Sequence, residues 1–133
     1  MFIIGLGTAA PPYRYTQKEC WEALQGLARF RELNPRSRAI LKKVLTGKSG
    51  IDTRHFALER LDQAFDLTPD AMHVRFARTA PVLATEAAER ALANSKTKPE
   101  EIDAVIVGTC TGYLCPGLTS YTGEPLRLPP TVL

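Results

Sequence analysis

The stretch that decides the fold is residues 103–122, which read DAVIVGTCTGYLCPGLTSYT. It opens with an apolar and mostly β-branched run at 104–107, typical of a buried strand, and Gly108 ends that run. Small polar residues then form a bend, and a helix is predicted to begin near Leu118, after the Pro116–Gly117 turn. Functional groups at the carboxyl end of a strand in an α/β layer commonly line a substrate pocket. The stretch therefore predicts a strand, a pocket-lining loop and a helix, in that order.

The composition is that of an ordinary globular chain. With 133 residues, 44% of them hydrophobic and 23% charged, the chain is long enough for a core and is not of the disordered type. A net charge of +3 is too small to indicate nucleic-acid binding. Three cysteines, without the features of a secretory leader, indicate reduced thiols, and no stretch approaches the roughly 18 apolar residues of a membrane span. We therefore expect a cytoplasmic protein, one domain or part of one, with neither nucleic acid nor membrane as a partner.

The N-terminal stretch is expected to form a second strand, followed by a glycine-rich turn. Residues 2–6 are apolar, and residues 5–10 fit the pattern G-x-G-x-x-A of dinucleotide-binding folds. That pattern requires a helix to begin at once, so that its N-terminus holds a pyrophosphate, and Pro11–Pro12 opposes this. The small residues are therefore interpreted as a tight exit of a central strand from its sheet, with residues 13–15 extending the loop.

Local start signals predict the helices that precede the central stretch. Thr16 and Glu19 form a capping box, while Asn34–Pro35 and Thr68–Pro69 each place a cap before a proline at the first helical position. The predicted helices cover residues 17–30, 35–45 and 69–93. The last of them carries an alanine-rich stripe, which predicts close packing against a neighbour. A helix, a turn and a buried strand in this order indicate a parallel α/β unit.

The sequence offers few candidates for catalysis by itself. Cys110 and Cys115 are spaced C-x4-C without the second ligand pair of a structural zinc site, so we expect no metal. Neither thiol lies in a nucleophile elbow or at a helix N-terminus that would lower its pKa. Residues 46–49, TGKS, lack the earlier glycine and the preceding strand of a P-loop. Lys48 is either part of a basic rim for a phosphate group or an ordinary surface lysine.

The pattern TCTGYLCPGLTSY at 109–121 strongly resembles bacterial type III polyketide synthases, the chalcone and stilbene synthase family. Residues 7–9 (GTA), 50–55 (GIDTRH) and 98–103 (KPEEID) match as well, so that the resemblance covers essentially the whole chain. It implies an α/β fold, the N-terminal part of a thiolase-like layered α/β/α/β/α architecture, with residues 1–133 as one incomplete domain. It also implies a homodimeric acyltransferase that condenses an acyl-CoA starter with malonyl-CoA, with CoA thioesters as substrates and no separate cofactor.

The resemblance also bears on catalysis. Members of the family use a cysteine to load the starter, and a histidine and an asparagine for decarboxylation and enolate stabilisation; none of these matches a residue of this chain. The resemblance therefore implies that the chain alone is inactive. It implies that Lys48 contacts the phosphates of CoA, although the companion basic positions of the family fall on Leu41 and Val44 here.

By the same resemblance, Cys110 and Thr111 line the acyl cavity, and Cys115 crosses the dimer interface and shapes the cavity of the partner. Their implied role is to limit the length and folding of the product. The chain departs from the family in the helix that follows, because Gly123 and Pro125 are poor helix-interior residues, and we interpret them as sequence drift.

Two other interpretations stay open at this point. A ketoacyl synthase III of fatty acid synthesis shares the thiolase fold and uses a carrier protein in place of free CoA, although the loop TGYLCPG at 111–117 favours the polyketide side. From another class, the chain could be a non-catalytic module that pairs with a full-length synthase through the loop around Cys115.

Overall fold

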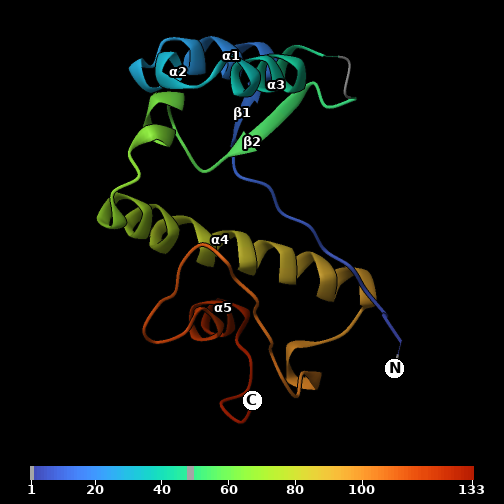
Figure 1. The fold of residues 1–133 in the computed structure, drawn as a ribbon. Helices are drawn as coiled ribbons and strands as arrows, with labels where there is room; N and C mark the ends of the chain where they lie inside the picture. Colours follow the sequence, from blue (N-terminus) through green and yellow to red (C-terminus); the bar gives the residue numbers. More distant parts are fainter. Residues whose placement is uncertain (1, 48–49) are drawn as a thin grey trace. The chain divides into compact units, whose positions relative to one another are not determined.

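The computed structural model describes residues 2–47 and 50–133. Its elements follow one another along the chain (Figure 1) as β1 (Tyr13–Thr16), α1 (Gln17–Gln25), α2 (Ala28–Glu32), α3 (Pro35–Thr46), β2 (Thr53–Phe56), the 3₁₀-helix η1 (Leu61–Phe65), α4 (Pro69–Ser95), the 3₁₀-helix η2 (Pro99–Glu101) and α5 (Leu118–Leu126). The chain divides into two compact units, Pro11–Asp66 and Met1–Ala10 together with Leu67–Leu133. In the described residues, no helix combines the length and the apolarity that crossing a lipid bilayer requires.

The helices of the unit Pro11–Asp66 begin where their caps predict. The Glu19 N–H donates to Thr16 Oγ1 at 3.1 Å, and the Thr16 N–H donates to the Glu19 carboxylate at 2.7 Å, so the predicted capping box is confirmed. α1 ends at Gln25 and does not continue to residue 30, because Gly26, a poor helix former, interrupts the pattern before α2. The cap predicted at Asn34 is also confirmed, since its Oδ1 accepts the Ser37 N–H at 2.8 Å.

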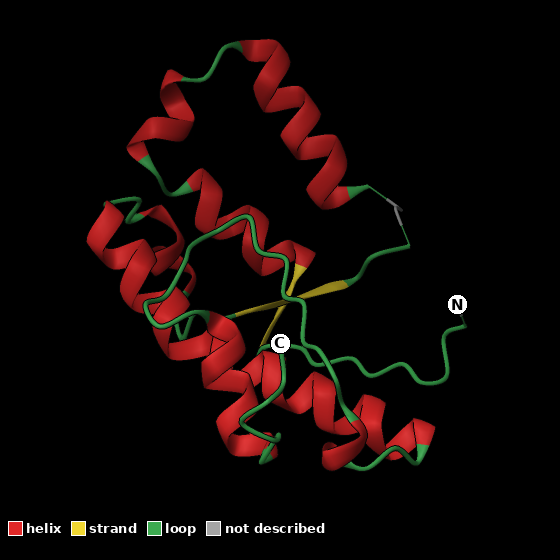
Figure 2. Cartoon of the chain, turned by 90° about the horizontal axis from the view of Figure 1, so that it is seen from below, coloured by secondary structure: helices red, strands yellow, loops and turns green. Residues whose placement is uncertain are grey.

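The loop expected at residues 13–15 is a strand in the structure, so that expectation is wrong. β1 pairs with β2, and both strands are drawn in yellow in Figure 2. The pairing is antiparallel, with Tyr13 opposite Phe56. The partner strand lies some 40 residues further along the chain, so the pairing leaves no local sign in a four-residue strand. His55 lies on β2, and its Nδ1 is 2.8 Å from the carbonyl oxygen of Pro11. This contact gives the ring a structural role, because it ties β2 to the segment before β1.

α4 is the longest element of the second unit. The predicted start is confirmed, because Thr68 Oγ1 accepts the Ala71 N–H at 3.4 Å, and the helix continues to Ser95. Residues 2–10 run beside its last turns (Figure 1), where the Asn94 side-chain amide donates to the Leu6 carbonyl oxygen at 2.8 Å.

Glycines allow this N-terminal segment to approach α4 closely. A Cβ atom added at Gly7 would lie 2.0 Å from the carbonyl oxygen of Ala87, and one added at Gly5 would lie 2.6 Å from that of Ala91. Real Cβ atoms do not approach backbone so closely, so both positions require glycine. The close packing predicted from the alanine-rich stripe of α4 is therefore confirmed.

The two central strands expected at 2–6 and 104–107 are not assigned as strands in the described part of the chain. One pair of backbone hydrogen bonds has parallel spacing: the Leu133 N–H donates to the Asp103 oxygen at 3.1 Å, and the Val105 N–H donates to the Leu133 oxygen at 2.9 Å. A strand requires a longer ladder, and this single contact does not supply one. The strand expected at 104–107 is therefore wrong for this structure. The apolar side chains favour burial, but a strand also requires a neighbouring strand with which its backbone can pair.

α5 forms despite the two residues that oppose a helix. Gly123 and Pro125 lie within it, and the cap residue Arg127, directly after its last residue Leu126, is in the left-handed region with φ 54°. α5 packs against α4, and Thr122 and Leu126 are buried, with 3% and 8% exposure. Burial of this face offsets the low helix propensity of Gly123 and Pro125.

Candidate functional site

The loop at 108–117 joins the extended run to α5 and carries the predicted cavity residues. The Thr109 hydroxyl donates to the Gly112 carbonyl oxygen at 3.2 Å, and the Thr111 N–H donates to Thr109 Oγ1 at 3.4 Å. Gly112 lies against α4, where an added Cβ would be 2.9 Å from Cγ of Phe76. Two hydrogen bonds within the loop therefore shape it, and the close approach of Gly112 to Phe76 places it against α4.

The structure places three of the four predicted site residues on this loop. Cys110, Thr111 and Cys115 are exposed, and the Cys110 Sγ lies 3.9 Å from the Thr111 hydroxyl. Both loop cysteines are free thiols. Lys48, the fourth predicted residue, lies outside the described residues. The loop therefore exposes two thiols and one hydroxyl at its surface.

The third cysteine belongs to the other unit and differs in character. Cys20 on α1 is half-buried and free. Burial, the main cause, raises the pKa of its thiol above the ordinary range. A raised pKa leaves less thiolate at neutral pH, which agrees with the structural role of a small buried hydrophobe.

Sequence reasoning missed His73 as a neighbour of the loop. Its ring on α4 lies 6.4 Å, between centroids, from that of Tyr113, with 55° between the ring planes. Tyr113 is 77% exposed, so this pair stands at the surface. Because 40 positions separate the two residues in the chain, only the packing of the loop on α4 brings them together. In the described residues, no three His, Cys, Asp or Glu side chains gather as a metal site.

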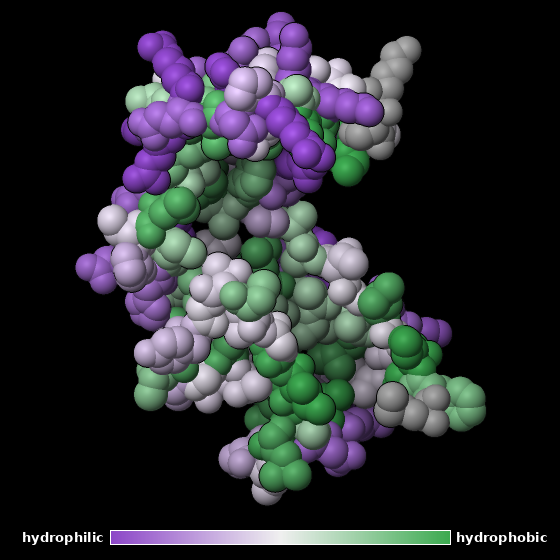
Figure 3. Space-filling model, in the orientation of Figure 1, coloured by the Kyte–Doolittle hydropathy of each residue, from purple (hydrophilic) through white to green (hydrophobic). Residues whose placement is uncertain are grey.

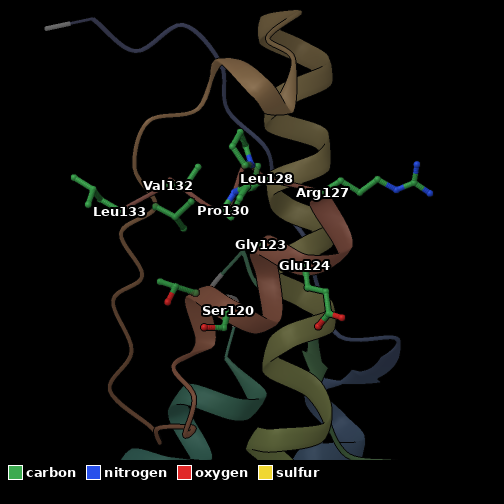
Figure 4. A pocket seen from close by; sticks show the side chains of 11 residues that line it. Ser120, Gly123, Glu124, Arg127, Leu128, Pro130, Val132 and Leu133 are labelled. Atoms are coloured by element: carbon green, nitrogen blue, oxygen red, sulfur yellow. The ribbon is translucent and has the colours of Figure 1, made fainter.

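A hollow of about 440 Å³ lies beside α5 (Figure 4). Its lining includes Val105, Ser120, Glu124, Arg127, Leu128 and Val132. In Figure 4, the apolar side chains of Val132 and Leu133 lie on one side, and the Arg127 guanidinium extends away from them. Of the predicted site residues that the structure describes, Cys110, Thr111 and Cys115 do not line this hollow. This hollow was not predicted from the sequence, because the residues that line it come from segments on both sides of the loop.

Among the described residues, the loop at 108–117 shows no pairing of a nucleophile with a base. Within the described part of the chain, neither Cys110 nor Cys115 is hydrogen-bonded to a histidine or a carboxylate that could act as a base.

Comparison with known proteins places these features in a family context. No family profile matches the sequence. An α-pyrone synthesis polyketide synthase-like protein, Pks18, from Mycobacterium tuberculosis is 30% identical, and the match covers 98% of this chain and 33% of Pks18. The type III polyketide synthase pspB of Penicillium soppii is 31% identical over 96% of this chain and 32% of its own length. The relatives of this chain are type III polyketide synthases.

Solved structures agree with the sequence relatives. The synthase PKS-I from the brown alga Ectocarpus siliculosus matches with a TM-score of 0.79 at 23% identity, covering 98% of this chain and 37% of the other. The fungal type III polyketide synthase ORAS matches with a TM-score of 0.73 at 25% identity, covering 97% and 34%. The expected α/β, thiolase-like fold class is therefore confirmed, in a helix-rich portion with a small sheet. The chain spans about a third of the length of the curated relatives it matches, and none of these relatives supports the ketoacyl synthase III or partner-module interpretation.

Proposed function

We propose that this chain is the N-terminal portion of a type III polyketide synthase, an acyltransferase that condenses an acyl-CoA starter with malonyl-CoA units. The observation that carries the proposal is the 30% identity to Pks18 across 98% of the chain. The proposal includes the homodimeric assembly of the family. It also includes a cytoplasmic location, which the three free thiols support.

In this proposal the loop at 108–117 shapes the acyl cavity and takes no part in bond making. Cys110 and Thr111 line the cavity, Cys115 reaches across the dimer interface, and Lys48 contacts the phosphates of CoA. The exposure of the three loop residues supports a role in contacting other groups. The loading cysteine and the groups that stabilise the enolate match no residue of 1–133, and covalent catalysis requires both. The isolated chain is therefore inactive in condensation.

The test compares the isolated chain with a chimera. The isolated chain is incubated with malonyl-CoA and an acyl-CoA, and we expect no release of free CoA above a heat-killed control. In the chimera, this chain replaces the matched third of Pks18, and we expect polyketide products by mass spectrometry. Within the chimera, Cys110→Phe and Cys115→Phe should shorten the products, because a larger side chain removes cavity volume. Cys20→Ser, in the other unit, serves as the matched control and should leave the products unchanged.

Three results would each contradict a part of the proposal. CoA release by the isolated chain, at a rate comparable with the chimera, would show that residues 1–133 contain the catalytic groups for this reaction. A chimera that is folded, as judged by a cooperative thermal melt, but forms no polyketide would contradict the proposed activity. Unchanged product length in both phenylalanine variants would remove the cavity role of the loop.

A further inference from the structure

A groove of about 320 Å³ opens between α1, α2 and α3, within the unit Pro11–Asp66. Its lining includes Trp21, Phe30, Pro35, Arg38, Ala39 and Lys42. The three helices that form it are seen together in Figure 1. None of its lining residues belongs to the loop at 108–117 or to the hollow beside α5, so this groove is a separate feature of the molecule.

The floor of the groove is aromatic. The rings of Trp21 and Phe30 meet edge to face, with centroids 5.4 Å apart and planes at 86°. Both residues are half-buried, so part of each ring remains accessible from the groove. Pro35 and Ala39 add flat apolar surface next to them. A planar, weakly polar ligand group can therefore pack here, because aromatic faces favour stacked or edge-on rings.

One wall of the groove is cationic. Arg38 and Lys42 are exposed and stand one helical turn apart on α3, so their charged ends lie on one face. Neither forms an ion pair with any residue that the structure describes. An arginine fork beside a lysine is a suitable receptor for phosphate oxygens.

The surroundings add to this positive field. Residues 28–46 contain six basic residues and one acidic residue, a net charge of +5, whereas the whole chain carries +3. Figure 3 shows hydrophilic side chains gathered over α1–α3. The two acidic residues nearest along the chain, Glu22 and Glu32, do not line the groove, and Glu22 pairs with Lys18 at 3.8 Å.

We propose that this groove binds a nucleoside phosphate. The base packs on Trp21 and Phe30, and the phosphate lies between Arg38 and Lys42. Gln25, which also lines the groove, offers an amide that can both donate to and accept from a base edge. The volume lies at the lower end of the range for small-molecule sites, which suits a single nucleoside better than a longer nucleic acid or a protein helix.

The same chemistry could come from two sources. One is a free mononucleotide, and the other is the 3′-phosphoadenosine end of CoA, which the proposed function would bring as substrate. The groove is distinct from the phosphate contacts that the family resemblance implies, because neither Leu41 nor Val44 lines it. The inference therefore uses the proposed function only to name the second source.

Trp21 is the only tryptophan of the chain, so its fluorescence reports on this groove alone. With excitation at 295 nm, the whole chain is titrated with AMP, adenosine 3′,5′-bisphosphate and CoA, and with adenosine as the ligand without phosphate. We expect saturable quenching by the phosphorylated ligands, weakened by added salt, and much weaker binding of adenosine. The variant Arg38→Gln/Lys42→Gln should bind about tenfold more weakly, as expected for the loss of charge-assisted contacts.

The matched control is Lys43→Gln, which removes one charge from the same helix at a position that does not line the groove. It should bind as the unchanged chain does, and far-UV circular dichroism should show equal helix content in all variants. Tighter binding of CoA than of either mononucleotide identifies CoA as the source; equal binding identifies a free nucleotide. Absence of saturable quenching by every phosphorylated ligand, or equal loss in Lys43→Gln and the double variant, overturns the proposal. Because the readout is binding to the isolated chain, failure here is distinguishable from failure of the chimera to make polyketide.

Discussion

Among single residues, Thr16 and Glu19 show how local chemistry starts an element. Each side chain satisfies a backbone N–H of the other residue, at 2.7 and 3.1 Å, in the first turn of α1. The hydrogen bond from the Thr16 N–H is the main cause that lowers the pKa of the Glu19 carboxyl below its ordinary value of 4.5. The ionised form is thus the one that the folded helix start prefers.

We predict that Thr16→Ala lowers the free energy of unfolding by about 1 kcal/mol at pH 7, the usual cost of losing an N-cap. Glu19 adds a pH dependence with a definite sign. Its folded pKa is lowered, so its contribution is present above pH 4.5 and is lost as the pH falls through 4.5 to the lower folded value. Urea unfolding, followed by circular dichroism at pH 7 and below pH 4, measures both effects.

Glu19→Gln is the control for this prediction. It keeps a side chain that can accept the Thr16 N–H but does not titrate, so its stability should fall less on acidification than that of the unchanged chain. An identical acid dependence of both proteins would contradict the linkage of Glu19 to stability.

At the scale of elements, the second unit depends on close approach to α4. Gly5 and Gly7 bring the N-terminal segment onto its last turns, Gly112 brings the loop at 108–117 onto Phe76, and α5 packs beside α4. Backbone and small side chains at these contacts leave no room for added atoms. Interiors packed in this way respond strongly to small increases in volume.

We predict that Gly7→Ala destabilises the second unit by about 1–3 kcal/mol, because the new methyl group would lie 2.0 Å from the Ala87 carbonyl oxygen. Gly108→Ala is the matched control, since an added Cβ there meets nothing within 4 Å. Its effect should stay within about 0.5 kcal/mol. Thermal or urea unfolding compares the two, and equal stability of both variants would show that the contact with α4 does not form in solution.

Over the whole molecule, many large apolar side chains are exposed and few apolar side chains are buried. In the described residues, the buried apolar core is Leu126, while Leu6, Ile106 and Leu133 are 72%, 95% and 92% exposed. Figure 3 shows apolar side chains gathered near both termini of the chain. Parallel sheets are normally covered on both faces, and contiguous apolar patches on a free chain favour association.

We predict that the isolated chain binds an apolar fluorescent dye and self-associates with rising concentration. The double variant Leu6→Ser/Ile106→Ser should reduce dye fluorescence and shift sedimentation toward the monomer, without loss of helix content. Val82→Ser on α4 removes another exposed side chain, 64% exposed, outside these segments and serves as the control. If Val82→Ser lowers dye fluorescence as much as the double variant does, the segments at 2–6 and 104–107 are not the binding surface.

Much of the helical structure and the family resemblance could be predicted from the sequence, since both depend on nearby residues. The caps at Thr16, Asn34 and Thr68 act over three or four positions, and all three begin helices where expected. The loop motif at 109–121 was likewise sufficient to indicate type III polyketide synthases, which the relatives confirm. Gly26 shows the limit of this local reasoning. The sequence pattern predicts one helix over residues 17–30, whereas the structure has α1 and α2 on either side of Gly26.

The sequence by itself determined where helices begin, which residues the loop carries and which family the chain resembles, because those signals are local or are kept as a contiguous motif. Only the tertiary structure decided which segments meet. It paired β1 with β2, placed His73 beside Tyr113, and assembled the groove of Trp21, Phe30, Arg38 and Lys42. It also showed that the apolar run at 104–107 lacks a strand ladder. The physical reason is that backbone pairing and side-chain packing depend on partners distant along the chain, which no local pattern of residues identifies.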